Sequence, residues 1–176
     1  MLAYKVLIEG RSPFTGLRWP VPSGGRPGEW VHATGPLGLC LNGVHACTVQ
    51  QLPQWLGSDL WAIELAGEVL ETDAALVAAR GRLLGPVPRW DSATRSRYAQ
   101  ACVLRARAGA VHERQAELLA TLEQVAIQGQ VAAAGYWAGV TAGEQACGQR
   151  FGEVYERAFA TERARQAQWL SDQLGL

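Results

Sequence analysis

Apolar and polar residues alternate along part of the first half of the chain. Between Leu60 and Val69, the side chains of Trp61, Ile63 and Leu65 alternate with small or acidic neighbours. Successive side chains of a strand point to opposite faces, so this pattern predicts a strand with one buried face. Similar but shorter patterns predict strands at residues 4–9, 29–33 and 76–84.

A turn signal lies within the segment Leu39–Cys47. Asn42-Gly43 is a dipeptide that type I′ turns prefer, because both central residues of that turn need positive φ. We therefore expect a β-hairpin in which Cys40 faces His45 across the strands and shares one face with His45 and Cys47. The opposite face of this hairpin is apolar and carries Leu39, Leu41, Val44 and Ala46. A short helix is expected to follow at residues 48–56.

Helical spacing of apolar residues characterises the second half. It predicts helices at residues 92–108, 111–128, 130–147 and 149–173. All eight prolines precede Trp90, and proline interrupts helices. The boundary is therefore placed near Arg89, with Asp91 or Ser92 as the N-cap of the first helix.

A glycine stripe marks the third predicted helix. Gly135, Gly139 and Gly143 recur every four residues and so lie on one helix face. Each glycine costs about 1 kcal/mol of helix propensity relative to alanine. We expect close packing against a neighbouring helix to offset this cost.

These patterns predict an α+β protein: a small twisted, mostly antiparallel sheet in the N-terminal half and a C-terminal helical bundle. Residues 1–89 form the strand- and turn-rich half, and residues 90–176 form the all-helical half; five of the seven tryptophans lie in the first 90 residues. We expect the two halves to make one compact unit.

Composition narrows the class of partners. The formal net charge is 0, with seven basic and seven acidic residues before Trp90 and nine of each after it. This balance disfavours nucleic acid and anionic membranes as partners. The start MLAYKVLIEG reads as a strand rather than a signal peptide, and four cysteines are too few for a secreted disulfide scaffold. We expect a cytoplasmic protein, and the oligomeric state stays open.

The cysteine- and histidine-bearing face of the hairpin is the main chemical candidate. Cys40 with His45 across the strands would suit a nucleophile and its base, with Cys47 as a second thiol. The same three residues with His32 would instead suit zinc, although the spacing C-x4-H-x-C is not a common zinc-finger pattern. A third interpretation is that these are small buried residues with a hydrogen-bonded histidine.

Several further residues are candidates for binding. Glu64 lies on the non-aromatic face of its predicted strand and would act as a base if that face lines a cleft; a solvated face is the alternative. Arginine or lysine beside an aromatic surface suits a phosphate or a flat ring, and a surface loop pinned by a buried tryptophan is the alternative. The candidate ligand-binding residues of this kind are Lys5, Arg18, Trp19 and Trp30.

In the helical half, aromatic and histidine side chains would line an interhelical pocket or pack in its core. These residues are Tyr98, His112, Tyr136 and Trp137. Core packing is the simpler interpretation, because no recognisable catalytic arrangement converges there.

The segments Phe14–Pro20, Gly43–Cys47, Gln51–Leu56 and Leu60–Glu68 together resemble an uncharacterised family of actinobacterial proteins. More distantly they resemble phage proteins of unknown function. The resemblance covers most of the first half and implies a shared domain without an established activity.

The order of elements is also similar to that of ADP-ribosyltransferase-like folds. In those folds a glycine-led strand, a short helix and a strand ending near an acidic residue follow one another, as Gly43–His45, residues 48–56 and Leu60–Glu68 do here. The similarity implies an NAD-binding protein, although residues 4–9 lack the His or Arg that those folds have on their first strand.

Three hypotheses follow. The first is a small-molecule enzyme of group-transfer or lyase type, of the kind used in biosynthesis, working in a cleft between sheet and helices. It would need no cofactor, and its reactive residues would come from Cys40, His45, Cys47 and Glu64. The second is a non-catalytic binding or accessory protein that uses a tryptophan-rich surface. The third is an ADP-ribosyltransferase-like protein that binds NAD.

Overall fold

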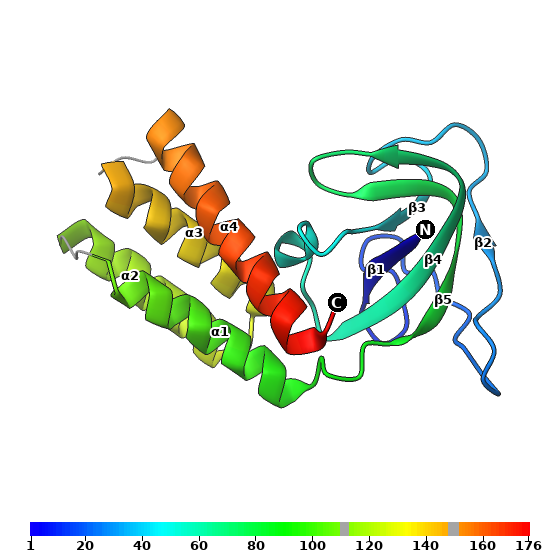
Figure 1. The fold of residues 1–176 in the computed structure, drawn as a ribbon, viewed down its shortest axis with the longest axis horizontal. Helices are drawn as coiled ribbons and strands as arrows, with labels where there is room; N and C mark the ends of the chain where they lie inside the picture. Colours follow the sequence, from blue (N-terminus) through cyan, green and yellow to red (C-terminus); the bar gives the residue numbers. More distant parts are fainter. Residues whose placement is uncertain (110–112, 148–151) are drawn as a thin grey trace. The chain divides into compact units, whose positions relative to one another are not determined.

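The computed structural model describes residues 1–109, 113–147 and 152–176. These residues form two compact units, Met1–Pro88 and Arg89–Leu176. The first unit contains the strands and the second contains the helices (Figure 1). The predicted α+β class is therefore confirmed.

The first unit is a single antiparallel sheet. Its order is β1-β4-β5-β2, and β3 pairs with β5 as well. A strand overlaps each of the segments predicted at 4–9, 29–33, 60–69 and 76–84, and the longest alternating pattern forms the middle of β4. The strands are β1 (Leu2–Leu7), β2 (Val31–His32), β3 (Val44–Ala46), β4 (Asp59–Glu71) and β5 (Leu76–Pro86).

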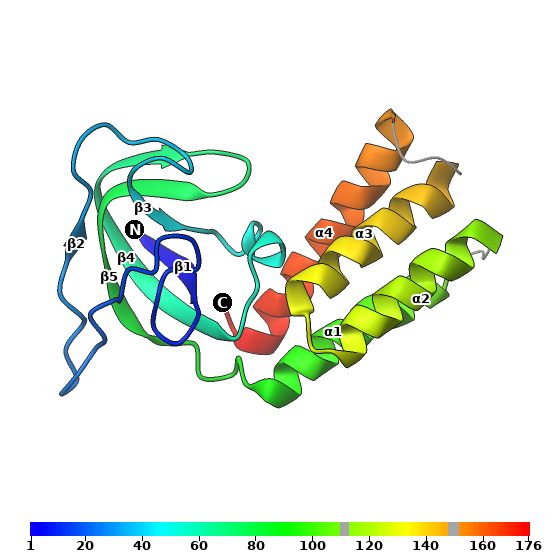
Figure 2. The same ribbon diagram turned by 180° about the vertical axis from the view of Figure 1, so that it is seen from behind.

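One backbone pair closes this sheet on itself. Tyr4 in β1 pairs with Cys47, which directly follows β3, through N–H···O bonds of 2.9 and 2.8 Å in the two directions. β1, β4, β5 and β3 are thereby joined in a ring. Closure requires curved strands, and β4 has a register shift between Ala66 and Val69 with Gly67 at φ +79°. The curvature of β4 and β5 is visible in Figures 1 and 2.

The inner face of the ring is the core of the first unit. Leu7, Ile63, Leu65, Leu76 and Leu83 are almost completely buried there. Trp61, which the alternation places with them, is half-buried and packs against the edge of this cluster.

The prediction of a β-hairpin with its turn at Asn42-Gly43 is wrong. The chain reverses instead at residues 39–41, where the N–H of Gly38 donates to the carbonyl of Asn42 at 2.9 Å. β3 then pairs with β5, Val44 opposite Ala78, rather than with residues 39–41. The predicted face shared by Cys40, His45 and Cys47 therefore does not exist as a strand face.

The physical reason lies in the two turn residues themselves. The Asn42 side-chain amide donates to the carbonyls of Gly35 and Pro36, at 3.1 and 2.9 Å, and so ties down the preceding loop. Gly43 has φ +133°, and a Cβ there would overlap the side chain of Val77 in β5. Glycine allows two strands to approach closely at this point; it does not form a turn.

The segment predicted as a helix at residues 48–56 contains only the 3-10 helix η1 (Leu52–Gln54). Pro53 lies within it. It is at the start of the segment, where proline is tolerated, and the helical bonding ends at the C-cap Trp55.

The second unit contains four described helices, as predicted. They are α1 (Ser92–Arg107), α2 (Glu113–Ile127), α3 (Val131–Cys147) and α4 (Glu153–Leu174). The Asp91 carboxylate accepts a bond from the Thr94 N–H at 2.7 Å, which confirms Asp91 as N-cap. The predicted helix starts at 111 and 149 fall outside the described residues.

The glycine stripe of α3 packs against α4, as expected. A Cβ at Gly139 would lie 2.7 Å from the Phe159 ring, and one at Gly143 would overlap the Tyr155 ring. The missing side chains therefore let the two helices approach closely. In the part of the chain that the structure describes, every helix is too short or too polar to cross a bilayer.

Candidate functional site

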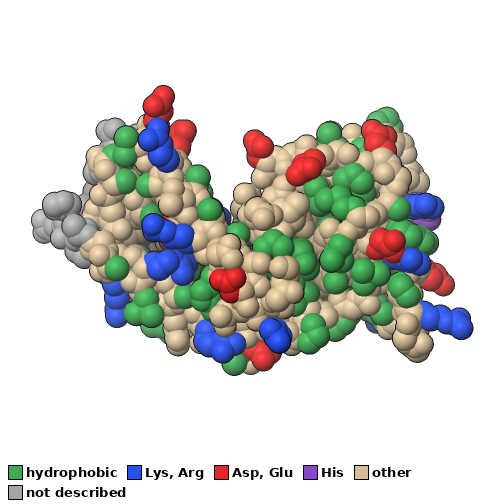
Figure 3. Space-filling view, viewed as in Figure 1, with side chains coloured by type: hydrophobic (Ala, Val, Ile, Leu, Met, Phe, Trp, Pro, Cys, Tyr) green, Lys and Arg blue, Asp and Glu red, His purple; other side chains and the backbone are tan. Residues whose placement is uncertain are grey.

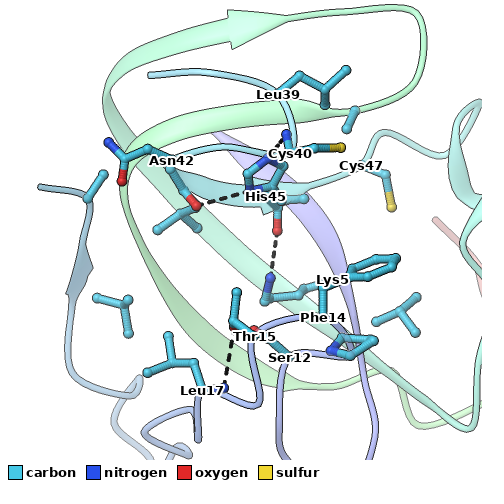
Figure 4. Close-up of a pocket in the computed structure, with 18 of the residues that line it drawn as sticks. Lys5, Ser12, Phe14, Thr15, Leu17, Leu39, Cys40, Asn42, His45 and Cys47 are labelled. Atoms are coloured by element: carbon cyan, nitrogen blue, oxygen red, sulfur yellow. Dashed lines mark hydrogen bonds between the residues drawn. The ribbon is translucent and has the colours of Figure 1, made fainter. Parts of the chain in front are cut away.

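A pocket of about 560 Å³ opens in the first unit. Its walls come from β1, β2, β3 and two loops, residues 12–19 and 33–43 (Figure 4). Apolar and aromatic side chains dominate the lining, and among the described residues that line it there is no Asp, Glu or Arg. The pocket therefore combines an apolar wall with very little charge.

Lys5 supplies the one ammonium group of this described lining. β1 carries it, opposite Trp61 of β4 in register. Its side chain is 7% exposed, its Nζ donates to the His45 carbonyl at 2.7 Å, and it lies 4.6 Å from the centre of the Trp19 ring. Burial lowers the pKa of Lys5 to about 8, and the neighbouring Cys47 opposes this effect.

Trp19 is held beneath this lysine by its own hydrogen bond. Its indole Nε1 donates to the Ser12 hydroxyl at 2.8 Å, and the ring is 4% exposed. The N–H of Trp19 also donates to the carbonyl of Gly10 at 3.0 Å. The cation and the ring face thus meet in a fixed geometry, as cation–π pairs do.

His45 acts on the backbone of the neighbouring turn. Its Nε2 accepts a hydrogen bond from the Cys40 N–H at 3.0 Å, and its Nδ1 lies 3.0 Å from the Gly43 carbonyl. Because Nε2 is an acceptor, Nδ1 carries the proton and donates to that carbonyl. Both ring nitrogens therefore hold the loop, and neither is directed at the Cys40 thiol.

The two cysteines of the pocket differ sharply in environment. Cys40 is exposed at the mouth, in the left-handed backbone region at φ +60°. Cys47 is 3% exposed and its thiol donates to the Tyr4 carbonyl at 3.3 Å. Burial raises the pKa of Cys47 to about 12, so its thiolate is disfavoured.

The zinc arrangement is not formed in the described structure. His32 lines the same pocket as Cys40, His45 and Cys47. Among the residues described, however, no three His, Cys, Asp or Glu side chains come close enough together to hold a metal ion.

Three of the predicted residues lie away from the pocket. Glu64 is on the outer face of β4 and pairs with its cross-strand partner Arg82 at 2.7 Å. Trp30 packs against that guanidinium, whose carbon lies 4.5 Å from its ring centre. Arg18 is exposed outside the lining. Strand alternation puts Glu64 on the face opposite to the core, in agreement with the solvated-face alternative.

The mouth of the pocket has an apolar rim that was not predicted from the sequence. Phe14 is 87% exposed and Leu41 is 89% exposed, and both line the mouth. Phe14 meets Trp55 edge-on, with ring centres 6.5 Å apart. Figure 3 shows apolar side chains at several places on the surface of this unit. The available signal was the presence of large apolar residues within turn-rich loops.

The aromatic residues considered in the helical half contribute to packing. Tyr98 is buried, and its hydroxyl donates to Gln166 Oε1 at 3.0 Å. Tyr136 and Trp137 meet edge-on at 5.5 Å. His112 lies outside the described residues.

The fold and the pocket define a small closed antiparallel sheet that holds one buried lysine, followed in the chain by a helical unit. No protein-family model, curated protein or solved structure matches the chain. The resemblances to the actinobacterial family and to ADP-ribosyltransferase-like folds stay predictions.

Proposed function

We propose that the N-terminal unit binds an apolar small molecule in the pocket beside Lys5. The observation that carries this proposal is a pocket of about 560 Å³ in this unit whose lining is mainly apolar. Ligand pockets commonly have volumes of roughly 300 to 1,000 Å³ and combine an apolar wall with a few polar groups.

The exposed rim supports the same proposal. Isolated exposed apolar side chains are ordinary on protein surfaces, but Phe14 and Leu41 border a single concavity. A bound molecule would cover both side chains and remove apolar surface from water. This gain is worth about 25 cal/mol for each Å² that is buried.

Binding is preferred to catalysis because three of the four expected reactive groups are engaged elsewhere, and the fourth, Cys40, has no described base directed at its thiol. The ring nitrogens of His45 bond to backbone, burial keeps Cys47 protonated, and Glu64 pairs with Arg82. The group-transfer or lyase activity stays a prediction. So does NAD binding, which nothing in the lining favours.

A neutral fluorescent probe tests the proposal. N-phenyl-1-naphthylamine is apolar and uncharged, and its emission rises when it leaves water. We expect saturable binding to the full chain, weakened about five- to tenfold by Phe14→Ser or Leu41→Ser, since each removes roughly 1 kcal/mol of apolar burial.

Leu84→Ser is the matched control. Leu84 is 38% exposed on β5 and lies outside the pocket lining. Its variant should bind the probe like the parent chain. Absence of saturable binding, or equal losses in all three variants, would overturn the proposal.

A further inference from the structure

We infer that the ligand of this pocket is an apolar carboxylic acid, whose carboxylate pairs with the Lys5 ammonium while its apolar body extends along Trp19 to the rim. This inference rests on the proposed function and names the chemical class of the ligand.

The pocket contains one charge that no described group of opposite sign compensates. Lys5 Nζ has three N–H donors, and a single hydrogen bond, to the His45 carbonyl, is described for it. The described residues lining the pocket include no carboxylate, so the ammonium has no anionic partner there. A buried cation without such a partner is costly, and a ligand anion would relieve that cost.

Lys5 is the single permanent cation among the described residues that line the pocket. The titratable groups that line the pocket besides Lys5 are Tyr4, His32, Cys40, His45 and Cys47. None of them is a permanent cation, and His45 is held as the neutral tautomer. A single carboxylate balances a single ammonium. A phosphate monoester would bring a second negative charge into an apolar pocket without an arginine to meet it.

The Lys5 ammonium group lies beside an aromatic wall of the pocket. It lies over the Trp19 ring, while Phe14 and Leu41 lie exposed at the mouth. In Figure 4 the Lys5 amine points toward His45, between the loop that carries Phe14 and Thr15 and the loop that carries Cys40. A molecule with a charged end and a flat apolar body matches a pocket with one charged point and aromatic walls.

Three naphthalene probes that differ only in the polar group test this inference. They are 1-naphthylacetate, its neutral amide 1-naphthylacetamide, and 1-naphthyl phosphate. We expect the full chain to bind the acetate at least tenfold more tightly than the amide, with the phosphate weaker than the acetate. Calorimetry at pH 7 measures all three affinities.

Lys5→Met keeps an unbranched side chain that is one atom shorter and removes the charge. In this variant the acetate should lose its tenfold advantage and bind within about twofold of the amide. The neutral amide also reports whether the pocket is intact, because its own affinity should change little. Lys5→Gln is a second variant, with the same expected loss, should the methionine disturb the strand.

The outcomes separate the two proposals. If the amide and the acetate bind equally well to the parent chain, or if the preference for acetate survives in both Lys5 variants, the carboxylate inference fails while the proposed function stands. Tighter binding of the phosphate than of the acetate would overturn the single-charge argument. If none of the probes binds, the proposed function itself fails.

Discussion

The Cys40 N–H donates to Nε2 of His45 at 3.0 Å, although no strand pairing joins the two residues. The turn at residues 39–41 is therefore fastened to β3 by a side chain. Cys40 is exposed, whereas the next cysteine along the chain, Cys47, is buried and its thiol donates to the Tyr4 carbonyl of β1.

This arrangement predicts the order in which thiols react. With Ellman's reagent on the native chain, Cys40 should label rapidly, whereas Cys47 and Cys102 should label only on unfolding. Burial excludes the reagent from both, and it raises the pKa of Cys47 to about 12 and that of Cys102 to about 11. Peptide mapping by mass spectrometry identifies each labelled residue. Cys40→Ser should remove the labelling of residue 40, and native labelling of Cys47 at the rate of Cys40 would contradict the prediction.

The buried lysine predicts a pH dependence of stability. The pKa of Lys5 is about 8 in the folded chain, below its ordinary value of 10.5. Between these values the unfolded chain binds more protons, so the contribution of Lys5 to the free energy of unfolding rises with pH. Between pH 7 and 9.5 the free energy of unfolding of the parent chain should therefore rise by about 2 kcal/mol relative to that of Lys5→Met.

Urea unfolding of both chains at the two pH values measures this change. The comparison with Lys5→Met cancels the titration of other groups, including Cys47, whose raised pKa acts in the opposite direction above pH 9. If the difference in free energy of unfolding between the two chains does not change with pH, the Lys5 ammonium is well solvated in the folded chain and the prediction fails.

The contact between α3 and α4 predicts that alanine at position 139 is harmful. In an exposed helix, Gly→Ala would stabilise the chain by about 1 kcal/mol. Here the new Cβ would lie 2.7 Å from the Phe159 ring, so we expect a net loss of about 1 to 3 kcal/mol. Thermal unfolding measures it. In a chain that already carries Phe159→Ala, Gly139→Ala should lower the free energy of unfolding by less than it does in the parent chain. If the effects of the two substitutions simply add, the contact between Gly139 and Phe159 does not cause the loss.

Gln166 of α4 lies at the centre of a buried polar network. Its Nε2 donates to the Gly135 carbonyl at 2.9 Å and to Glu162 Oε1 at 3.0 Å, and its Oε1 accepts from the Tyr98 hydroxyl. Glu162 in turn pairs with Arg105 at 2.9 Å. Gln166→Leu would leave several of these groups without a partner, so we expect a loss of about 2 to 4 kcal/mol.

Gln168→Leu is the matched control for this prediction. Gln168 is exposed on the same helix and bonds to Asp172. Its replacement should change the free energy of unfolding by less than about 0.5 kcal/mol. Equal effects of the two substitutions would mean that the buried network contributes little to stability.

Local patterns in the sequence determined the class of the fold and most of its elements. The alternation around Ile63 sets which face of β4 is buried, and the proline distribution separates sheet from helices. Asp91 caps its helix as predicted, and the glycine stripe of α3 marks a close helix contact. These features depend on residues near one another in the chain, so local periodicity is sufficient to find them.

The pocket was decided only by tertiary structure. Asn42-Gly43 has the composition of a hairpin turn, but β3 pairs with the long strand β5, and the paired residues are 30 to 34 positions apart in the chain. The same long-range pairing brings Lys5 of β1 beneath the carbonyl of His45, while strand alternation turns Glu64 outward to Arg82. Closure of the sheet through Tyr4 and Cys47 is a non-local event. Sequence periodicity therefore identified the strands and the candidate residues, but it did not determine which of those residues would share a pocket.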